Sequence, residues 1–374
     1  MKLPDYPHAP ESAAAASEAA ADPAALAALA APPEAIDIAT TAYEVAVAEL
    51  RRLLAAWRLH EPGARLGVDP EDLHQLRVTA RRIDAILSLF RRQLPASLVR
   101  ARKGTKAVLR HLGATRDLDV QLAELADYCA GLSDEERAAA EPLRARLESE
   151  RMRARTRMIR ALDSEPTRRW LETLAAPSTA GGSSDKSDRA MLVMPQRVRR
   201  RFRKLRKSVG KLRERSPMED YHRVRRRAKQ LRYATECGAV MFGKPADDLL
   251  KALRRLQDGL GARQDAYTAQ KRLAALATDP ASGLPPATLF LMGRLAEHHA
   301  RVTAQTHRTL LRAWRKVRGK RWKALRTRLA ELHDSADAVS GTLAAPEDIS
   351  DGAPSPDSTP PARIAAPETR PVRH

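Results

Sequence analysis

The chain has 374 residues, and its 67 Lys and Arg against 46 Asp and Glu give a formal net charge of +21. Two cysteines exclude a disulfide framework or a cysteine-based zinc site, and 4 Trp, 6 Tyr and 4 Phe are few for a protein that stacks nucleic-acid bases. There is no signal-peptide pattern at the N-terminus and no uncharged apolar run of about 18 residues, so we expect a soluble, cytoplasmic protein.

The composition divides the chain into two tails, a linker and two folded halves. Residues 1–34 are rich in Ala and Pro, and residues 336–374 are rich in Pro, Ser and Asp; both are predicted to be disordered. Residues 177–188, PSTAGGSSDKSD, are typical of a flexible linker between halves at 35–176 and 189–335. Both tails are net acidic, so the positive charge lies in the body, which should attract polyanions.

Within the halves, apolar residues follow the period of an α-helix. One such stripe consists of Leu76, Ala80, Ile83, Leu87 and Phe90. The same spacing continues over residues 109–125, where Gly113 is expected to break the helix, and alternating patterns typical of strands are missing. The sequence therefore predicts an all-α protein built from long antiparallel helices.

An internal repeat relates the two halves. Residues 74–81 (HQLRVTAR) correspond to 222–229 (HRVRRRAK), residues 112–114 (LGA) correspond to 260–262 (LGA), and Asp117 corresponds to Asp265. In both halves the glycine lies 39 residues after the histidine and the aspartate 43 residues after it. Such register predicts two similar helical units that face each other about a pseudo-two-fold axis.

On a helix, the repeated His, Arg and Arg/Lys share one face, opposite the apolar stripe. Guanidinium groups bind phosphate oxygens bidentately and an ammonium group acts as a point charge, so this face suits a row of phosphates. A solvated surface helix also shows a basic face, and a single histidine can simply be buried. The duplication favours binding, because a solvated surface gives no reason for the same pattern to occur twice.

The repeated segments resemble the CHAD family, the conserved histidine α-helical domain. The resemblance lies in residues 69–82 and 112–120 of the first half and in residues 222–236 and 256–265 of the second, and it spans about 37–335. It implies two pseudo-symmetric antiparallel four-helix bundles that form one body with a basic cleft or pore between them. It also implies non-enzymatic binding of inorganic polyphosphate and association with polyphosphate granules in the cytoplasm.

Carried over by residue, the resemblance assigns ligand contacts to His74, Arg77, Arg81, Arg82, His222, Arg225, Lys229 and Arg232. Further contributors are expected at Lys106, Arg110 and Arg226. Asp117 and Asp265 are interpreted as structural, either orienting arginines or capping a helix after the glycine. Asp84 replaces a base of the family pattern and is expected to pair with Arg77 or Arg81. Protonation of His74 and His222 below about pH 6.5 should strengthen binding.

Other features leave alternatives open. Residues 197–215 hold 11 bases and one acid, which could extend a polyanion track, touch nucleic acid or form a solvated helix flank. Complete phosphate-loop and H-E-x-x-H motifs are missing, and chance explains His298-His299 and His333-Asp334 better than metal binding. We therefore expect no enzyme, cofactor or metal. The alternatives are a nucleoid or RNA-associated protein and, less favoured, a metal-dependent phosphohydrolase; the oligomeric state is open.

Overall fold

The computed structural model describes residues 40–176 and 189–342 together with the isolated Ala28, and side chains up to 335. The predicted tail at 1–34, apart from Ala28, and the predicted linker at 177–188 lie outside the described residues. The predicted C-terminal boundary at 335 falls inside the last helix, which extends to Thr342, and the rest of that tail also lies outside.

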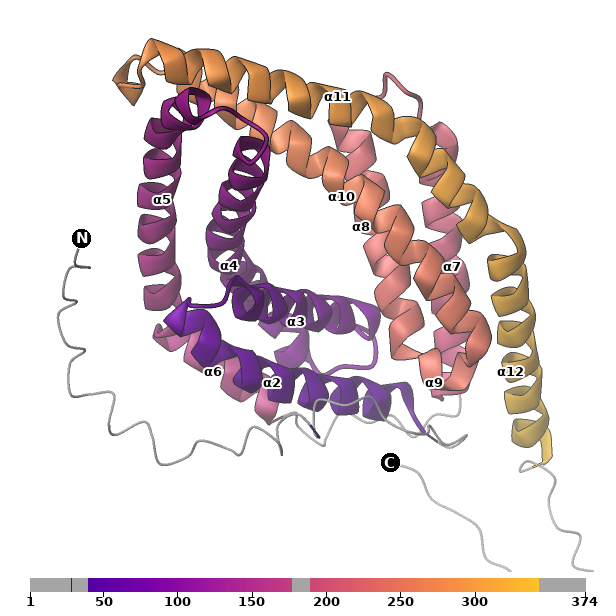
Figure 1. Ribbon diagram of the computed structural model, residues 1–374. Coiled ribbons are helices and arrows are strands. Elements are labelled where there is room, and N and C mark those ends of the chain that lie inside the picture. Colours follow the sequence, from indigo (N-terminus) through magenta and orange to yellow (C-terminus); the bar gives the residue numbers. More distant parts are fainter. Residues whose placement is uncertain (1–27, 29–39, 177–188, 343–374) are drawn as a thin grey trace, which may run out of the picture.

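The described chain is helical throughout (Figure 1). The first half contains α2 (Ala42–Leu66), α3 (Pro70–Leu89), α4 (Ala96–Cys129), α5 (Asp134–Leu162) and α6 (Glu165–Ala175). The second half contains α7 (Ala190–Lys211), α8 (Met218–Cys237), α9 (Ala239–Phe242), α10 (Lys244–Thr278), α11 (Pro286–Lys316) and α12 (Trp322–Thr342), with short helices η4 (Pro280–Ser282) and η5 (Val317–Arg321). An isolated bridge between Thr41 and Arg189 is the only β pairing among the described residues. The all-α prediction is confirmed.

Local sequence signals set where the helices of the first half begin. Thr41 forms a capping box with Glu44, which fixes the start of α2. Asp69 caps α3 by accepting a hydrogen bond from the backbone N–H of Glu71, and Pro70 occupies the first helical position. The cap thus fixes the start of α3 five residues before His74, so His74 and the bases that follow it lie within a regular helix.

The packing of the helices repeats between the halves, as the sequence repeat predicts. In the first half α2 packs on α3, α3 on α4 and α4 on α5, while α6 lies against α2 and α4. In the second half α7 packs on α8, α8 on α10 and α10 on α11, while α12 lies against α7 and α10. Equivalent helices also meet across the molecule, in the pairs α2–α7, α3–α8 and α5–α11. This is the arrangement that a pseudo-two-fold relation requires.

One continuous hydrophobic core joins the halves. It includes Trp57 and Phe90 from the first half and Tyr221 and Phe242 from the second, all essentially without solvent exposure. A smaller apolar cluster lies where α5 meets α11, around Leu143 and Met292. Because the large core contains side chains from both halves, the two units form a single body and their relative placement is fixed by packing.

The helix break predicted at Gly113 is wrong. The helix α4 runs without interruption from Ala96 to Cys129, and α10 runs through Gly261 in the same way. A glycine inside a helix costs stability relative to alanine, so it needs another reason to be there. The reason lies in the contacts of the basic face described next.

Candidate functional site

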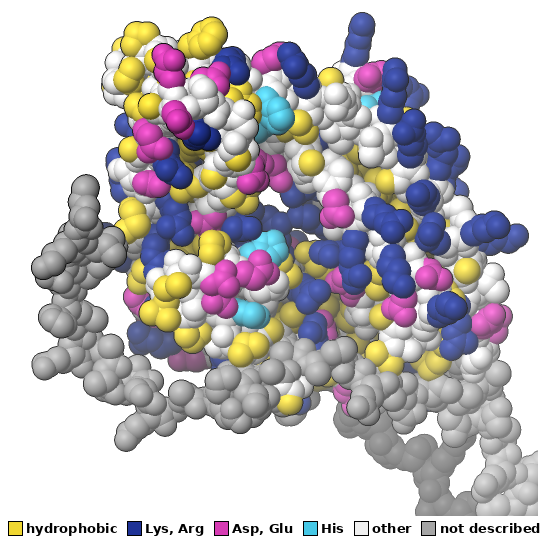
Figure 2. Space-filling view, viewed as in Figure 1, with side chains coloured by type: hydrophobic (Ala, Val, Ile, Leu, Met, Phe, Trp, Pro, Cys, Tyr) yellow, Lys and Arg dark blue, Asp and Glu magenta, His cyan; other side chains and the backbone are white. Residues whose placement is uncertain are grey.

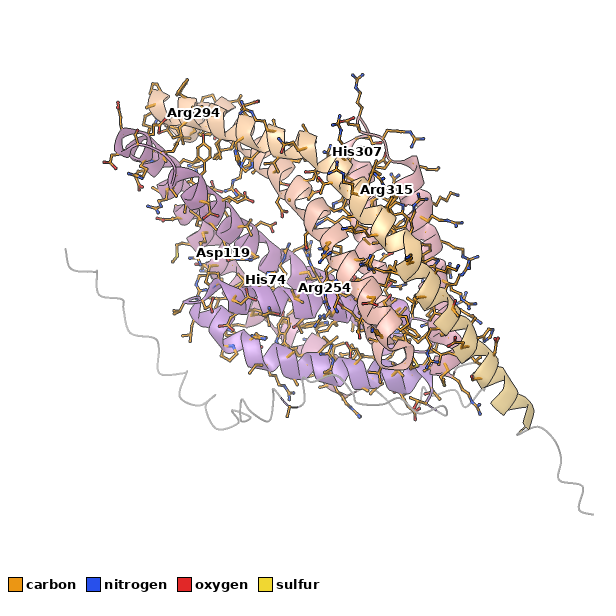
Figure 3. The ribbon with its side chains drawn as sticks, turned by 45° about the vertical axis from the view of Figure 1, so that its right-hand side comes forward. His74, Asp119, Arg254, Arg294, His307 and Arg315 are labelled. Carbon is orange, nitrogen blue, oxygen red and sulfur yellow. The ribbon has the colours of Figure 1, made fainter. Side chains whose placement is uncertain are left out.

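The basic faces of α3 and α8 face each other near the centre of the molecule. The two helices contact one another, and each presents its repeated His, Arg and Arg/Lys pattern on the side away from the core. Figure 2 shows a hollow in the middle of this view with Lys, Arg and His side chains around it, together with some Asp and Glu side chains at its rim. Figure 3 places His74 on α3 beside this region, with Asp119 on the neighbouring α4. We call the space between the two basic faces the cleft.

The charges in the cleft influence each other across the two halves. Burial and the charge of Arg81 lower the pKa of Arg77 to about 10, with a further contribution from Arg225 on the other half. Burial also lowers the pKa of Arg225, and Arg81 again contributes. Coulombic effects of this kind fall off steeply with separation and with solvent exposure. Arg77, Arg81 and Arg225 therefore converge from α3 and α8 on one partly buried space.

Lys229 is the most perturbed base of the cleft. Burial lowers its pKa from 10.5 to about 6, and the positive charges of Arg81, Arg225, Arg77 and Arg232 add to that effect. Among the described residues, no carboxylate lies within ion-pair distance of Arg81, Arg225 or Lys229. The Nε atoms of Arg82, Arg225 and Arg232 are buried without an acceptor in the described part of the chain. The cleft thus holds more positive charge and more donors than its own acidic groups satisfy.

Gly113 lets the side chain of Arg77 cross the backbone of the neighbouring helix. A Cβ atom added at Gly113 would lie 2.2 Å from Nη1 of Arg77, so the guanidinium occupies the space of a side chain on α4. The same guanidinium lies 3.2 Å from Oδ1 of Asp117, one turn further along α4. At Gly261 the equivalent contact with Arg225 is looser, at 3.7 Å. Gly113 is therefore a position of close approach rather than a helix break.

The predicted structural role of the repeated aspartates is confirmed in one of its two forms. Asp117 orients Arg77, but neither Asp117 nor Asp265 caps a helix, because α4 and α10 are continuous at these positions. Burial raises the pKa of Asp265, and the nearby Arg225 opposes that shift. The pairing predicted for Asp84 is wrong, since Asp84 binds Arg102 of α4, with 2.7 Å between Oδ1 and Nε. Asp84 lies 18 residues before that partner, and helical periodicity alone cannot indicate such a contact.

At one end of the cleft, three arginines surround Glu236. Arg82 of α3 lies 3.8 Å from this carboxylate, Arg232 of α8 lies 3.6 Å from it, and Arg254 of α10 lies 4.0 Å from it. Arg254 was not predicted; the signal that could have found it is Glu236 itself, an acid at i+4 from Arg232 inside a basic segment. Arg82 and Arg232 are thus shared between Glu236 and the cleft, and their charge is partly neutralised.

His74 behaves differently from the prediction. Burial lowers the pKa of His74, and the charges of Arg116, Arg77 and Arg81 lower it further although Glu71 opposes them. Protonation of His74 near pH 6.5 in the free protein is therefore not expected, because it would add charge to a basic and half-buried place. His222 is exposed, with its Nδ1 3.3 Å from Oε1 of Gln264.

The additional predicted contributors lie on exposed surface. Lys106 and Arg110 precede Gly113 by two turns and one turn of α4, so they share its face with Asp117 and border the place where Arg77 crosses. Arg226 is exposed on α8. The structure describes no direct contact between these three side chains and the bases of the cleft. They surround it rather than line it.

The described residues contain no group of three or more His, Cys, Asp and Glu suited to hold a metal ion. His298 packs against the ring of Tyr128, and burial lowers the pKa of its neighbour His299. None of the helices that the structure describes is long and apolar enough to cross a membrane.

Residues 48–274, more than half of the chain, match the profile of the CHAD domain. The chain belongs to the CHAD domain family. A crystal structure of the CHAD domain from the plant Ricinus communis is similar, with a TM-score of 0.62 and 25% sequence identity over 76% of this chain and 96% of the other. PptA from Streptomyces chartreusis shares the fold, with a TM-score of 0.60 and 20% identity over 74% of this chain and 100% of the other. No curated protein sequence matches the chain.

The profile covers both helices, α3 and α8, whose basic faces form the cleft of this CHAD domain. It extends from α2 through most of α10, and thus includes α3, α4 and α8 with their repeated motifs. The pairs Arg77–Gly113 and Arg225–Gly261 both lie inside the matched region. The helices α11 and α12 lie beyond the matched region. In the second half they occupy the places that α5 and α6 occupy in the first.

Proposed function

We propose that this CHAD domain binds inorganic polyphosphate in the cleft between α3 and α8 and leaves it chemically unchanged. The observation that supports this best is the convergence of Arg77, Arg81, Arg225 and Lys229 from the facing helices α3 and α8 on one partly buried space, where only Arg77 has a carboxylate within ion-pair distance among the described residues. Gathering these charges costs free energy in the free protein, and a chain of phosphates would repay part of that cost. Arginine forks bind phosphate oxygens bidentately, and successive phosphates would meet donors from both halves.

Nucleic acid is the second candidate, favoured by the exposed bases of α7 and α11. The cleft itself suits nucleic acid less well. The ring of Tyr233 lies under the guanidinium of Arg232, 4.9 Å from its centroid, and the residue is buried, so it offers no free face for stacking a base. A bare phosphate chain needs no such face.

A competition experiment at several salt concentrations tests the proposal. The protein is loaded with labelled long polyphosphate, and unlabelled polyphosphate, duplex DNA and RNA are added as competitors. We expect affinity to fall steeply with salt and the nucleic acids to displace the label poorly. If DNA or RNA displaces polyphosphate at equal phosphate concentration, the cleft is not selective for polyphosphate and the second candidate is favoured.

Charge reversal locates the site. We expect the double variant Arg77→Glu, Arg225→Glu to weaken polyphosphate binding by roughly 100-fold or more, because it turns two attractive contacts into repulsive ones. Arg153→Glu, Arg157→Glu on the exposed face of α5 is the matched control and should change affinity only slightly. Equal losses in both variants would contradict a cleft-centred site. Circular dichroism confirms that each variant is folded.

Two further measurements test whether the protein hydrolyses polyphosphate and whether it collects on granules in the cell. Polyphosphate incubated with the protein and Mg²⁺ or Mn²⁺ should keep its chain length on a gel, and shortening would indicate a phosphohydrolase. A fluorescent fusion should collect on polyphosphate granules, and the double charge-reversal variant should remain dispersed. A granule signal that persists in that variant would place granule binding outside the cleft.

A further inference from the structure

Two groups of bases within the dense run at 197–215 have different surroundings. The first group consists of arginines that are bound to the protein itself. Arg197 lies over the ring of Phe90 and donates to the backbone of Leu89, and Arg201 donates to the carbonyl oxygen of Gln230 at 2.9 Å. These arginines join α7 to α3 and α8. Their charge serves the packing of the fold and leaves little capacity for a ligand.

The second group forms a groove on the outer side of α7 and α8. A pocket of 320 Å³ lies between the two helices and is lined by Lys204, Lys207, Ser208, Lys211, Asp220, Arg223 and Arg227. Arg227 is held on its floor by hydrogen bonds to the carbonyl oxygen of Lys204, at 2.9 Å, and to Oγ of Ser208. Asp220 is bound to Arg223 at 2.7 Å. We call this pocket the outer groove.

The three lysines of the outer groove are available to a ligand. Lys204, Lys207 and Lys211 follow one another at spacings of three and four residues, so they share one face of α7, and all three are exposed. Within the part of the chain that the structure describes, none of them forms an ion pair. Five bases and one acid therefore surround a recess of a size that admits a phosphate group. Figure 2 shows Lys and Arg side chains gathered along the side formed by α7 and α11.

The surface of α8 connects the cleft with the outer groove. Around this helix, away from its core-facing stripe, the basic side chains follow in the order Arg232, Arg225, Lys229, His222, Arg226, Arg223 and Arg227. The first three and the last are partly buried, whereas His222, Arg226 and Arg223 are exposed. The two ends of this arc thus lie in recesses, the cleft and the outer groove, and the exposed side chains form a crest between them.

We propose that the outer groove is a second subsite for the same phosphate chain, which leaves the cleft, crosses the crest of α8 and ends against Lys204, Lys207 and Lys211. This inference rests on the proposed function. The path covers about half the circumference of a helix about 10 Å across, so it is on the order of 15 Å long. A short phosphate chain in the cleft would not reach the groove, and a long one would. The outer groove therefore makes affinity depend on chain length.

The test compares long polyphosphate with tripolyphosphate, each measured by calorimetry at one salt concentration. The groove variant is Lys204→Gln, Lys207→Gln, Lys211→Gln. The control variant, Arg153→Gln, Arg157→Gln, Arg160→Gln, removes the same charge from exposed positions of similar spacing on α5. We expect the groove variant to weaken binding of long polyphosphate by roughly tenfold while tripolyphosphate binds as in the wild type. The control should lose much less.

The outcomes separate this inference from the proposed function. If the groove and control variants lose affinity for long polyphosphate equally, only net charge matters and the second subsite is refuted, although tripolyphosphate binding still supports the cleft. If the groove variant loses binding to DNA or RNA but not to long polyphosphate, the groove is a separate nucleic-acid site and the inference is also refuted. If Arg225→Gln leaves the binding of both phosphate probes unchanged, the proposed function itself fails.

A chain-length series gives a second readout, in which the short chains measured on each protein serve as its internal reference. In the wild type, affinity per chain should rise with length until the chain spans the crest, and then level off. In the groove variant the rise should stop at shorter chains. Identical profiles in the two proteins would overturn the inference.

Discussion

The guanidinium of Arg77 on α3 lies against the backbone of α4 at Gly113, so close that a Cβ atom at residue 113 would be 2.2 Å from its Nη1. In the second half, a Cβ atom at Gly261 would lie 3.7 Å from Nη2 of the equivalent arginine, Arg225. The sequence repeat thus places the same two residue types together in both halves, but only the first pair depends on the missing side chain.

This difference predicts that two alanine substitutions affect polyphosphate binding differently. Gly113→Ala should displace Arg77 from its contact with Asp117 and weaken polyphosphate binding severalfold. The protein should remain folded, because the far end of a long side chain can move and alanine favours the helix by about 1 kcal/mol. Calorimetric titration together with urea unfolding measures both effects.

Gly261→Ala is the matched control. A Cβ atom there would make ordinary van der Waals contact with Arg225, so we expect stability to rise by up to about 1 kcal/mol and binding to stay close to wild type. Equal effects of the two substitutions on affinity would show that the approach of Arg77 to α4 does not matter for the ligand.

The sequence predicts the faces of the helices better than their partners. The period of α3 and α8 and the matched spacing of His, Gly and Asp were sufficient to place both basic faces opposite the core, and the structure brings these faces together. The pairing of Asp84 with Arg102, by contrast, depends on how α3 and α4 are rotated against each other. A helical pattern specifies which side chains share a face, but not which side chains of another helix meet that face.

The run at 197–215 shows the same limit. Its composition leaves a polyanion track, a nucleic-acid contact and a solvated flank open, with a slight preference for a functional role because so dense a run of charge repels itself. Only the packing reveals that Arg197 and Arg201 are tied to α3 and α8 while the lysines line a groove. Arginine and lysine have the same charge, but the planar guanidinium carries more donors in a fixed arrangement, which suits Arg197 and Arg201 to hydrogen bonds that join helices.

Binding of polyphosphate should take up a proton at Lys229. The pKa of this residue is about 6 in the free protein because of burial and the surrounding charges of Arg81, Arg225, Arg77 and Arg232, with Asp265 of α10 as the facing acid. Lys229 is therefore mostly neutral at pH 7.5. Bound phosphates favour its charged form and raise its pKa, so affinity should increase as the pH falls from 8 to 6 and level off below.

Calorimetry in two buffers with different ionisation enthalpies measures this proton directly at pH 7.5. Lys229→Arg is the control variant, because a guanidinium remains charged throughout the pH range and has no proton to take up. Burial lowers the pKa of His74, so that residue contributes mainly at lower pH. Proton uptake that is the same in Lys229→Arg would assign it to another group.

Neutralising Glu236 should strengthen binding. This carboxylate competes with phosphates for Arg82, Arg232 and Arg254. Glu236→Gln keeps the size of the side chain and releases their charge, so we expect affinity for polyphosphate to rise a few-fold and its salt dependence to become steeper. The free protein should lose stability, because like charges are then left close together.

The same experiment on Glu148→Gln, an exposed carboxylate of α5 paired only loosely with Arg144 at 3.9 Å, corrects for the change in net charge. If both substitutions raise affinity by the same factor, the position of Glu236 at the end of the cleft is irrelevant and its effect is that of total charge alone.

Two aspartates of one motif, Asp117 and Asp119, should give opposite results when each is changed to asparagine. Asp119 is buried, with its side chain 3% exposed, and its Oδ1 lies 2.5 Å from Nε of Arg151 on α5. Asp119→Asn leaves that arginine without its counter-charge, so unfolding should become easier by about 3 kcal/mol. The folded fraction should still bind polyphosphate with an affinity close to wild type.

Asp117, by contrast, is 60% exposed and contacts Arg77 at 3.2 Å. Asp117→Asn should change the free energy of unfolding by less than about 1 kcal/mol, since exposed ion pairs contribute little. It should nevertheless weaken polyphosphate binding, because Arg77 loses the group that holds it across Gly113. Urea unfolding and titration on both variants separate the two roles. A binding defect confined to Asp119→Asn would mean that α5 packing, and not the orientation of Arg77, controls the cleft.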